Sequence, residues 1–97
     1  MPQEIDPTVK SLVSAIAQTE TGQSNPQAYT KRGASGEYGR YQFMPVTWNS
    51  IAPQAGVTTS LEKSSVEDQN KVAYTKIKAW KDKGYNPAQI ASMWNAG

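Results

Sequence analysis

The chain has 97 residues, a length that fits one small domain built around a single hydrophobic core. It contains no cysteine and no histidine, which excludes disulfides, thiolate chemistry and a histidine base. Ten Lys and Arg stand against eight Asp and Glu, and the net charge of +2 is lower than a nucleic-acid-binding domain normally carries. No apolar run approaches the length of a membrane span, and no secretory signal is visible at the N-terminus. We therefore expect one folded domain, 1–97, whose chemistry relies on carboxylates, lysines, tyrosines or hydroxyls.

The first predicted helix begins after Asp6, which can cap it, and runs to about Thr21 before Gly22. Pro7 suits the first helical position. The residues expected to face the core are spaced by three and four positions: Val9, Leu12, Val13, Ile16 and Ala17.

The same apolar stripe ends on a carboxylate, because Glu20 follows Ile16 by four residues. One interpretation is a side chain that extends into solvent at the helix end. The other is a partly buried acid whose pKa is raised by desolvation and by the helix dipole. A raised pKa is what a general acid needs in order to work near neutral pH.

The middle of the chain is expected to be irregular. Tyr38 to Phe43 are compatible with a small β-hairpin or an irregular crossing. Phe43 and Met44 are expected in the core, and a short helix is expected to begin at Pro45 and to be ended by Pro53.

A second long helix is expected from about Ser65 to Gly84, with Ser65 and Asp68 in a capping-box arrangement. Its predicted core face consists of Val66, Val72, Ala73, Ile77 and Trp80. The densest run of basic residues in the chain lies on this helix and is expected to form a solvated face: Lys76, Lys78, Lys81 and Lys83.

A last helix follows Asn86-Pro87 and carries Ile90, Met93 and Trp94, with Trp94 expected in the core. Three or four helices with little strand predict a mainly α domain.

Several short motifs follow one another in a particular order along this chain. They are Glu20-Thr21-Gly22, Asn25-Pro26, Gly33-Ala34, Gly39-Arg40-Tyr41-Gln42-Phe43-Met44-Pro45 and Trp94-Asn95-Ala96-Gly97. This order resembles the lysozyme-like lytic transglycosylase family, which includes soluble lytic transglycosylases and relatives among resuscitation-promoting factors and phage lysins. The resemblance covers about residues 10–97 and departs where Thr21 stands for the usual Ser and Trp94 for the usual Tyr. It implies a small lysozyme-like helical domain with at most a short β-hairpin beside an active-site cleft.

The activity that the resemblance implies is cleavage of peptidoglycan between N-acetylmuramic acid and N-acetylglucosamine. Glu20 would act as general acid and base, and the product would carry 1,6-anhydro-muramic acid ends. One carboxyl group is enough for this reaction, because the nucleophile is the C6 hydroxyl of the same sugar. The implied partner is a glycan strand, without a metal, a cofactor or nucleic acid, and the implied location is the cell envelope, the periplasm or the cell exterior.

The resemblance also places Gly39, Tyr38, Tyr41 and Gln42 in a sugar-binding cleft that faces Glu20. Glycine lets the backbone approach a ligand closely, a tyrosine ring can lie against a pyranose, and Gln42 can both donate and accept hydrogen bonds. Strand-like alternation would divide these residues between cleft and core, so that one tyrosine ring is free, and the sequence does not decide which.

Two further residues are implied at the ends of helices. Thr21 is expected to hydrogen-bond Glu20 or to cap the helix end. Asn95 is expected either to reach the cleft from the last helix or to cap that helix before Gly97.

A hydrolase would need a second carboxylate, which makes a muramidase the main alternative. Glu37 is the acidic residue of the motif region, 17 residues after Glu20, and goose-type lysozymes, which are similar in fold, carry an acid in a comparable segment. Alternatively, Glu37 is a solvent-facing loop carboxylate paired with Arg32 or Arg40. A non-catalytic glycan-binding wall module is a further alternative, as is a helical interaction domain with a chance match.

The chain stops at Gly97, whereas domains of this family usually continue for another helix or more. We therefore expect a minimal version of the domain, a C-terminal truncation, or a partner chain that supplies the rest. An apolar patch left uncovered at that end would favour self-association.

Overall fold

The computed structural model describes residues 5–21 and 29–95, and only the backbone of Thr21 and Asn95. Four α-helices make up most of this part of the chain: α1 (Pro7–Thr21), α2 (Pro45–Ile51), α3 (Val66–Asp82) and α4 (Pro87–Asn95). Two short 3-10 helices, η2 (Ala52–Ala55) and η3 (Leu61–Lys63), lie between α2 and α3. The mainly α class is therefore confirmed.

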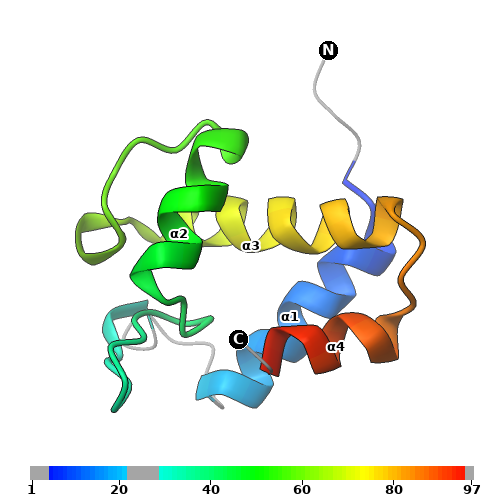
Figure 1. Ribbon diagram of the computed structural model, residues 1–97, viewed down its shortest axis with the longest axis horizontal. Coiled ribbons are helices and arrows are strands. Elements are labelled where there is room, and N and C mark those ends of the chain that lie inside the picture. The colour runs from blue at the N-terminus through cyan, green and yellow to red at the C-terminus, as the bar shows by residue number, and fades with distance from the viewer. Residues whose placement is uncertain (1–4, 22–28, 96–97) are drawn as a thin grey trace.

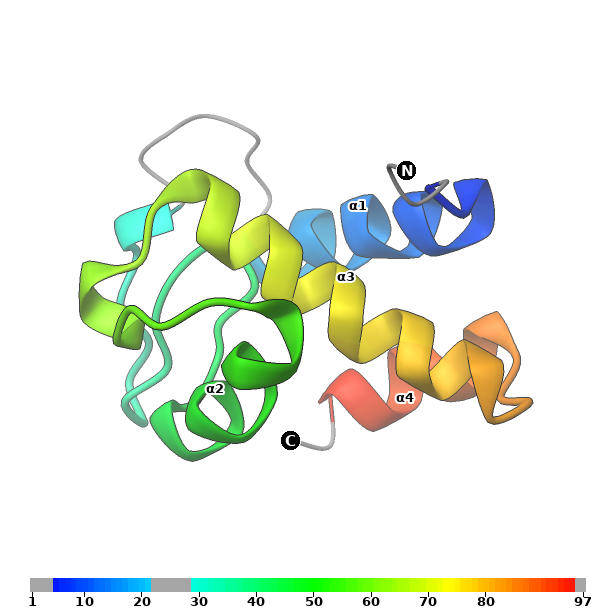
Figure 2. The ribbon, with the colours of Figure 1, turned by 90° about the horizontal axis from the view of Figure 1, so that it is seen from above.

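The central helix of the fold is α3. It crosses the middle of Figure 1, with α2 over its N-terminal half and α1 and α4 below its other half. The other three helices all pack against α3, and α4 also packs against α1. Residues 29–44 lie between the C-terminal end of α1 and the start of α2, at the left of both ribbon views (Figures 1 and 2).

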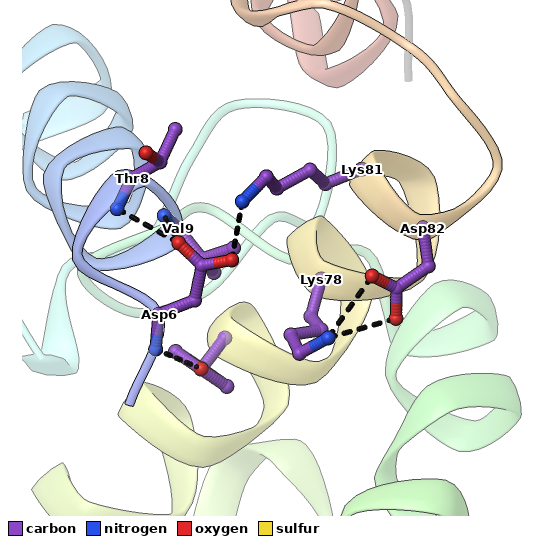
Figure 3. Close-up of polar contacts among 7 residues, drawn as sticks. Asp6, Thr8, Val9, Lys78, Lys81 and Asp82 are labelled. Atoms are coloured by element: carbon purple, nitrogen blue, oxygen red, sulfur yellow. Dashed lines mark hydrogen bonds and ion pairs between the residues drawn. The ribbon is translucent and has the colours of Figure 1, made fainter. Parts of the chain in front are cut away.

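Asp6 caps α1 as the sequence predicts. Its Oδ1 atom accepts hydrogen bonds from the backbone N–H groups of Thr8 at 2.9 Å and Val9 at 3.3 Å. Its other carboxylate oxygen pairs with Lys81 near the end of α3 (Figure 3). The backbone N–H of Asp6 also donates to the Tyr74 hydroxyl at 2.8 Å. One residue thus both starts α1 and ties it to α3.

The starts of the two later helices also match the sequence prediction. The Asp68 N–H donates to Ser65 Oγ at 3.1 Å, and the Ser65 N–H donates to Asp68 Oδ2 at 3.2 Å, which completes the predicted capping box of α3. At α4, Asn86 and Gln89 exchange an equivalent pair of bonds of 2.8 and 2.9 Å. These caps satisfy N–H groups that have no partner within the helix.

The core is built around aromatic side chains from α2, α4 and the segment before α2. The ring of Phe43 lies 5.3 Å from those of both Trp48 and Trp94, in edge-to-face arrangements. The indole N–H of Trp48 donates to the Thr59 carbonyl at 2.9 Å, and that of Trp94 donates to the Tyr41 carbonyl at 3.2 Å. Trp94 is buried, as expected. Such pairs add to the free energy gained by burial of the rings.

Two residues expected in the core are exposed. Val66 is 46% exposed, because it is the first residue of α3 and the buried stripe begins one turn later, at Gln69. Met44 is 37% exposed, because it occupies the N-cap position where the chain turns into α2.

The short helix expected from Pro45 is confirmed, because α2 ends at Ile51, before Pro53; Pro53 lies at the start of η2, where its missing N–H is tolerated. One further expectation is corrected. Lys76 does not belong to a solvated face, because its ammonium lies 4.9 and 4.5 Å from the ring centroids of Trp80 and Trp94. Burial lowers the pKa of Lys76.

Candidate functional site

Glu20 lies in the last turn of α1 and is half-buried. Its pKa is raised above the usual value of 4.5, first by desolvation and second by the negative charge of Glu37. Of the ion pairs between described residues, none involves Glu20. Desolvation is therefore opposed by no cation in this part of the chain, and the protonated form of Glu20 is favoured.

The segment that carries Gln42 is a tight turn rather than a pair of strands. Tyr38 and Phe43 exchange backbone hydrogen bonds of 2.9 and 3.1 Å, and Gln42 N–H closes the turn on the Gly39 carbonyl at 3.1 Å. Gly39 and Gln42 both have positive φ, 90° and 53°. Strand-like alternation therefore does not describe residues 39–42. It separates buried Tyr41 from half-buried Gln42, as expected, but it does not account for the burial of both Tyr38 and Tyr41.

Glu37 and Gln42 come together over Gly33. A Cβ atom built on Gly33 would lie 2.7 Å from both Gln42 Oε1 and Glu37 Oε2, so only glycine leaves room for the two side-chain ends. Glu37 Oε1 accepts the backbone N–H of Ser35 at 2.8 Å. The Gln42 amide nitrogen donates to the carbonyls of Gly39 at 2.7 Å and Lys31 at 3.1 Å.

Glu37 does not form the arginine pairs that the sequence suggested among the described residues. Arg32 instead pairs with Glu62 at 3.7 Å, and Arg40 lies over the rings of Tyr29 and Tyr41. Glu37 is half-buried, and its charge acts on Glu20. The interpretation of Glu37 as a freely solvated loop residue is therefore corrected.

Neither tyrosine of the motif presents a free ring. Tyr38 is 7% exposed and Tyr41 is 1% exposed, because both rings join the aromatic core. The Arg32 guanidinium lies 5.1 Å from the centroid of the Tyr38 ring. Burial raises the pKa of Tyr41 to about 12. The expectation that one of these rings lies open to a sugar is wrong.

Gly39 makes room for protein rather than for a ligand. A Cβ atom on Gly39 would lie 2.4 Å from Gln69 Oε1. This fully buried amide on α3 accepts the Arg40 N–H at 3.1 Å and donates to the Tyr29 carbonyl at 2.9 Å and Ser64 Oγ at 3.0 Å. Gln69 thus fixes the position of the turn that carries Gln42.

A second network supports the same turn. The hydroxyls of Tyr29 and Tyr41 both donate to Asn70 Oδ1, and Arg40 Nη1 donates to the Tyr29 hydroxyl at 3.0 Å. The sequence analysis did not identify Gln69, Asn70 or Tyr29. The sequence does mark Gln69 as unusual, because it lies three residues before Val72 and four before Ala73, on the apolar stripe of α3. Glu20 is a polar residue on the apolar stripe of α1 in the same way.

Two predicted site residues cannot be placed. The side chains of Thr21 and Asn95 lie outside the described part of the structure, as do residues 22–28 and 96–97. The backbone of Thr21 is the last residue of α1, and that of Asn95 is the last residue of α4.

No family model matches the chain, and neither a curated protein nor a solved structure matches it. None of the described helices is long and apolar enough to cross a membrane. Within the same described ranges, no three acidic side chains gather as they would around a metal ion.

Proposed function

We propose that the chain is a peptidoglycan lytic transglycosylase in which Glu20 is the general acid and base. The observation that carries the proposal is the half-buried Glu20, with a raised pKa, next to Glu37 and the turn that bears Gln42. A carboxyl group in such surroundings keeps its proton closer to neutral pH than an exposed one does. The substrate class rests on the ordered motifs described for the sequence, and it carries with it a lysozyme-like fold and a location in the cell envelope.

The proposed reaction has two proton transfers at Glu20. The protonated carboxyl donates its proton to the glycosidic oxygen while the bond from that oxygen to C1 of the muramic acid breaks, and an oxocarbenium-like centre forms at C1. The carboxylate then takes the proton of the C6 hydroxyl of the same sugar while its oxygen bonds to C1. Glu20 ends protonated again, and the product carries a 1,6-anhydro ring.

The charge of Glu37 keeps Glu20 protonated before the first step, because a nearby negative charge makes Glu20 harder to ionise. The Gln42 amide nitrogen is held by two backbone carbonyls, so its Oε1 atom is the part of this side chain that suits a hydroxyl or amide N–H of the sugar. Tyr38 and Tyr41 hold this turn in place through their buried rings, and Gly39 does so by leaving room for Gln69.

A muramidase is the second candidate, and the proximity of Glu37 to Glu20 is what favours it. In that reaction Glu37 would activate a water molecule while Glu20 protonates the leaving oxygen. The product would then carry a reducing end. A wall module that binds glycan without cutting it would have no use for a desolvated acid.

Mass spectrometry of peptidoglycan fragments after digestion tests these candidates. The wild type is compared with Glu20→Gln and Glu37→Gln. We expect anhydro-muropeptides from the wild type, their loss in Glu20→Gln by at least about 100-fold, and their persistence in Glu37→Gln.

Reducing-end products that disappear in both variants would replace the transglycosylase with a muramidase. Intact binding of glycan without any product from the wild type would contradict both enzymes and support a binding module.

A further inference from the structure

A groove of about 800 Å³ lies between the N-terminal halves of α1 and α3. Lys10 and Val13 line it from α1, Asn70 and Lys71 line it from α3, and Arg40 and Tyr41 line it from the turn before α2. Glu20 and Glu37 are not among its described lining residues, so the groove is separate from the two carboxylates.

The groove nevertheless continues the candidate site along α1. Val13 and Glu20 are seven residues apart, so they lie on the same face of the helix and about 10 Å apart along its axis. On the opposite wall, Arg40 and Tyr41 directly precede Gln42, whose side chain lies beside Glu37 over Gly33. The same two segments therefore border both the carboxylate pair and the groove.

The charge changes sign along this path. The groove is lined by three cations, Lys10, Arg40 and Lys71, and by one carboxylate, Glu67. This local excess of two positive charges equals the net charge of the whole chain, +2. The pair of Lys71 and Glu67 is exposed and 3.8 Å apart, so it neutralises the groove only weakly.

Arg40 has no carboxylate partner among the described residues. Its described contacts are the Tyr29 hydroxyl and the faces of the Tyr29 and Tyr41 rings, and none is a carboxylate. Its Nε atom is buried without a hydrogen-bond partner among the described residues. Because that atom is buried, an anion in the groove would be attracted by the charge of the guanidinium rather than bonded at Nε.

We propose that this groove binds the carboxylates of an acidic peptide, namely the peptide stem attached to the glycan strand. The identity of the ligand rests on the proposed function. An extended peptide covers about 3.3 Å per residue, so about three residues span the 10 Å from Glu20 to Val13 on the groove wall. Apolar side chains such as Val13 and Val66 along the same groove suit a peptide backbone with small side chains. Two excess charges are fewer than a nucleic acid normally meets.

Binding of defined glycan fragments to the full chain tests the proposal. The Glu20→Gln protein is the background, so that binding is measured without cleavage. Calorimetry compares a glycan oligomer that carries peptide stems with the same oligomer after an amidase has removed them. We expect the stems to raise affinity about fivefold at low salt, with the gain falling as salt screens the charges.

Two double variants locate the effect. Lys10→Gln with Lys71→Gln should remove the gain from the stems, whereas Lys63→Gln with Lys83→Gln removes the same charge from exposed residues outside the groove lining and should preserve it. All four lysines are exposed, so the folded state is expected to persist in both variants. The proposal would be overturned if the stems did not raise the affinity of the Glu20→Gln protein, or if they raised it equally in the two double variants.

Failure of the proposed function has a different signature. If the oligomer without stems does not bind either, glycan is not the substrate. Binding of the released peptide on its own then tests whether the groove is an acidic-peptide site. Binding of that peptide that is lost with Lys10→Gln and Lys71→Gln would still support an acidic-peptide site. If the released peptide did not bind, the acidic-peptide proposal would be overturned. It would also be overturned if a single-stranded oligonucleotide bound through the same two lysines while the peptide did not.

Discussion

At Glu20, burial and the neighbouring carboxylate of Glu37 both raise the pKa of the side chain. The sequence indicates the first of these effects, because the residue stands on an apolar stripe. It does not supply the second, because the position of Glu37 depends on how residues 29–44 fold back toward α1.

The first prediction separates the two effects. In Glu37→Gln the repulsive charge is removed and desolvation remains, so the pKa of Glu20 should fall but stay above its usual value of 4.5. NMR titration of the Glu20 carboxyl carbon in both proteins measures the change. An unchanged titration would show that Glu37 does not act on Glu20.

Gly33 provides the second prediction. In Gly33→Ala, the new Cβ would displace the ends of the Glu37 and Gln42 side chains. Both ends are hydrogen-bonded to the backbone, so their displacement should lower the free energy of unfolding by about 1–2 kcal/mol, while activity on peptidoglycan should fall much further. Thermal unfolding and product formation, measured on the same sample, distinguish a local displacement from a general loss of structure. Full activity would show that the arrangement over Gly33 is not needed.

Among the elements, the helices are well predicted and the turn before α2 is not. The caps at Asp6, Ser65 and Asn86 depend on contacts with residues two or three positions away, which a sequence pattern contains. The turn at 39–42 depends on Gln69, which is 29 residues from Arg40 in the chain. A local pattern carries no information on that contact, so alternation wrongly left one tyrosine ring free.

Gln69 is therefore expected to be a main support of the turn. Replacing it in Gln69→Leu leaves the Arg40 N–H and the Tyr29 carbonyl without their described partner, which should reduce the free energy of unfolding by about 2–4 kcal/mol. Gln54→Leu is the control, because Gln54 is exposed and makes one bond within its own helical region, and it should change stability by less than about 0.5 kcal/mol. Denaturant unfolding of the two variants makes the comparison. Equal stabilities would contradict the role given to Gln69.

For the whole molecule, the contact between Asp6 and Lys81 joins the start of the chain to the end of α3 (Figure 3). The pKa of Asp6 is lowered, first by its bond to Lys81, with the N–H groups of Val9 and Thr8 adding to the effect. A lowered carboxyl pKa means that the folded state binds its proton less readily than the unfolded state. The stabilisation from Asp6 is thus present above its usual pKa of 3.8 and is lost as the pH falls through the folded value.

Asp6→Asn should therefore lower the melting temperature at neutral pH, with the difference from the wild type shrinking in acid. Asp82→Asn is the matched control, because Asp82 pairs with Lys78 within one helix and joins no other element. Its effect should be smaller, as is usual for exposed pairs four residues apart. Melting curves from neutral pH to about pH 2 provide the measurement. A difference that does not shrink in acid would show that the carboxylate charge is not its source.

The three tryptophans are distributed one each to α2, α3 and α4, as Trp48, Trp80 and Trp94, and α1 contains no aromatic residue. The rings of Trp80 and Trp94 lie 6.3 Å apart and perpendicular to each other, and Phe43 lies between Trp94 and Trp48. Intrinsic fluorescence and near-ultraviolet circular dichroism will therefore follow the joining of these three helices. The helix that carries Glu20 has no aromatic side chain of its own, so its detachment would register only through the tryptophans of α3 and α4, the helices against which it packs.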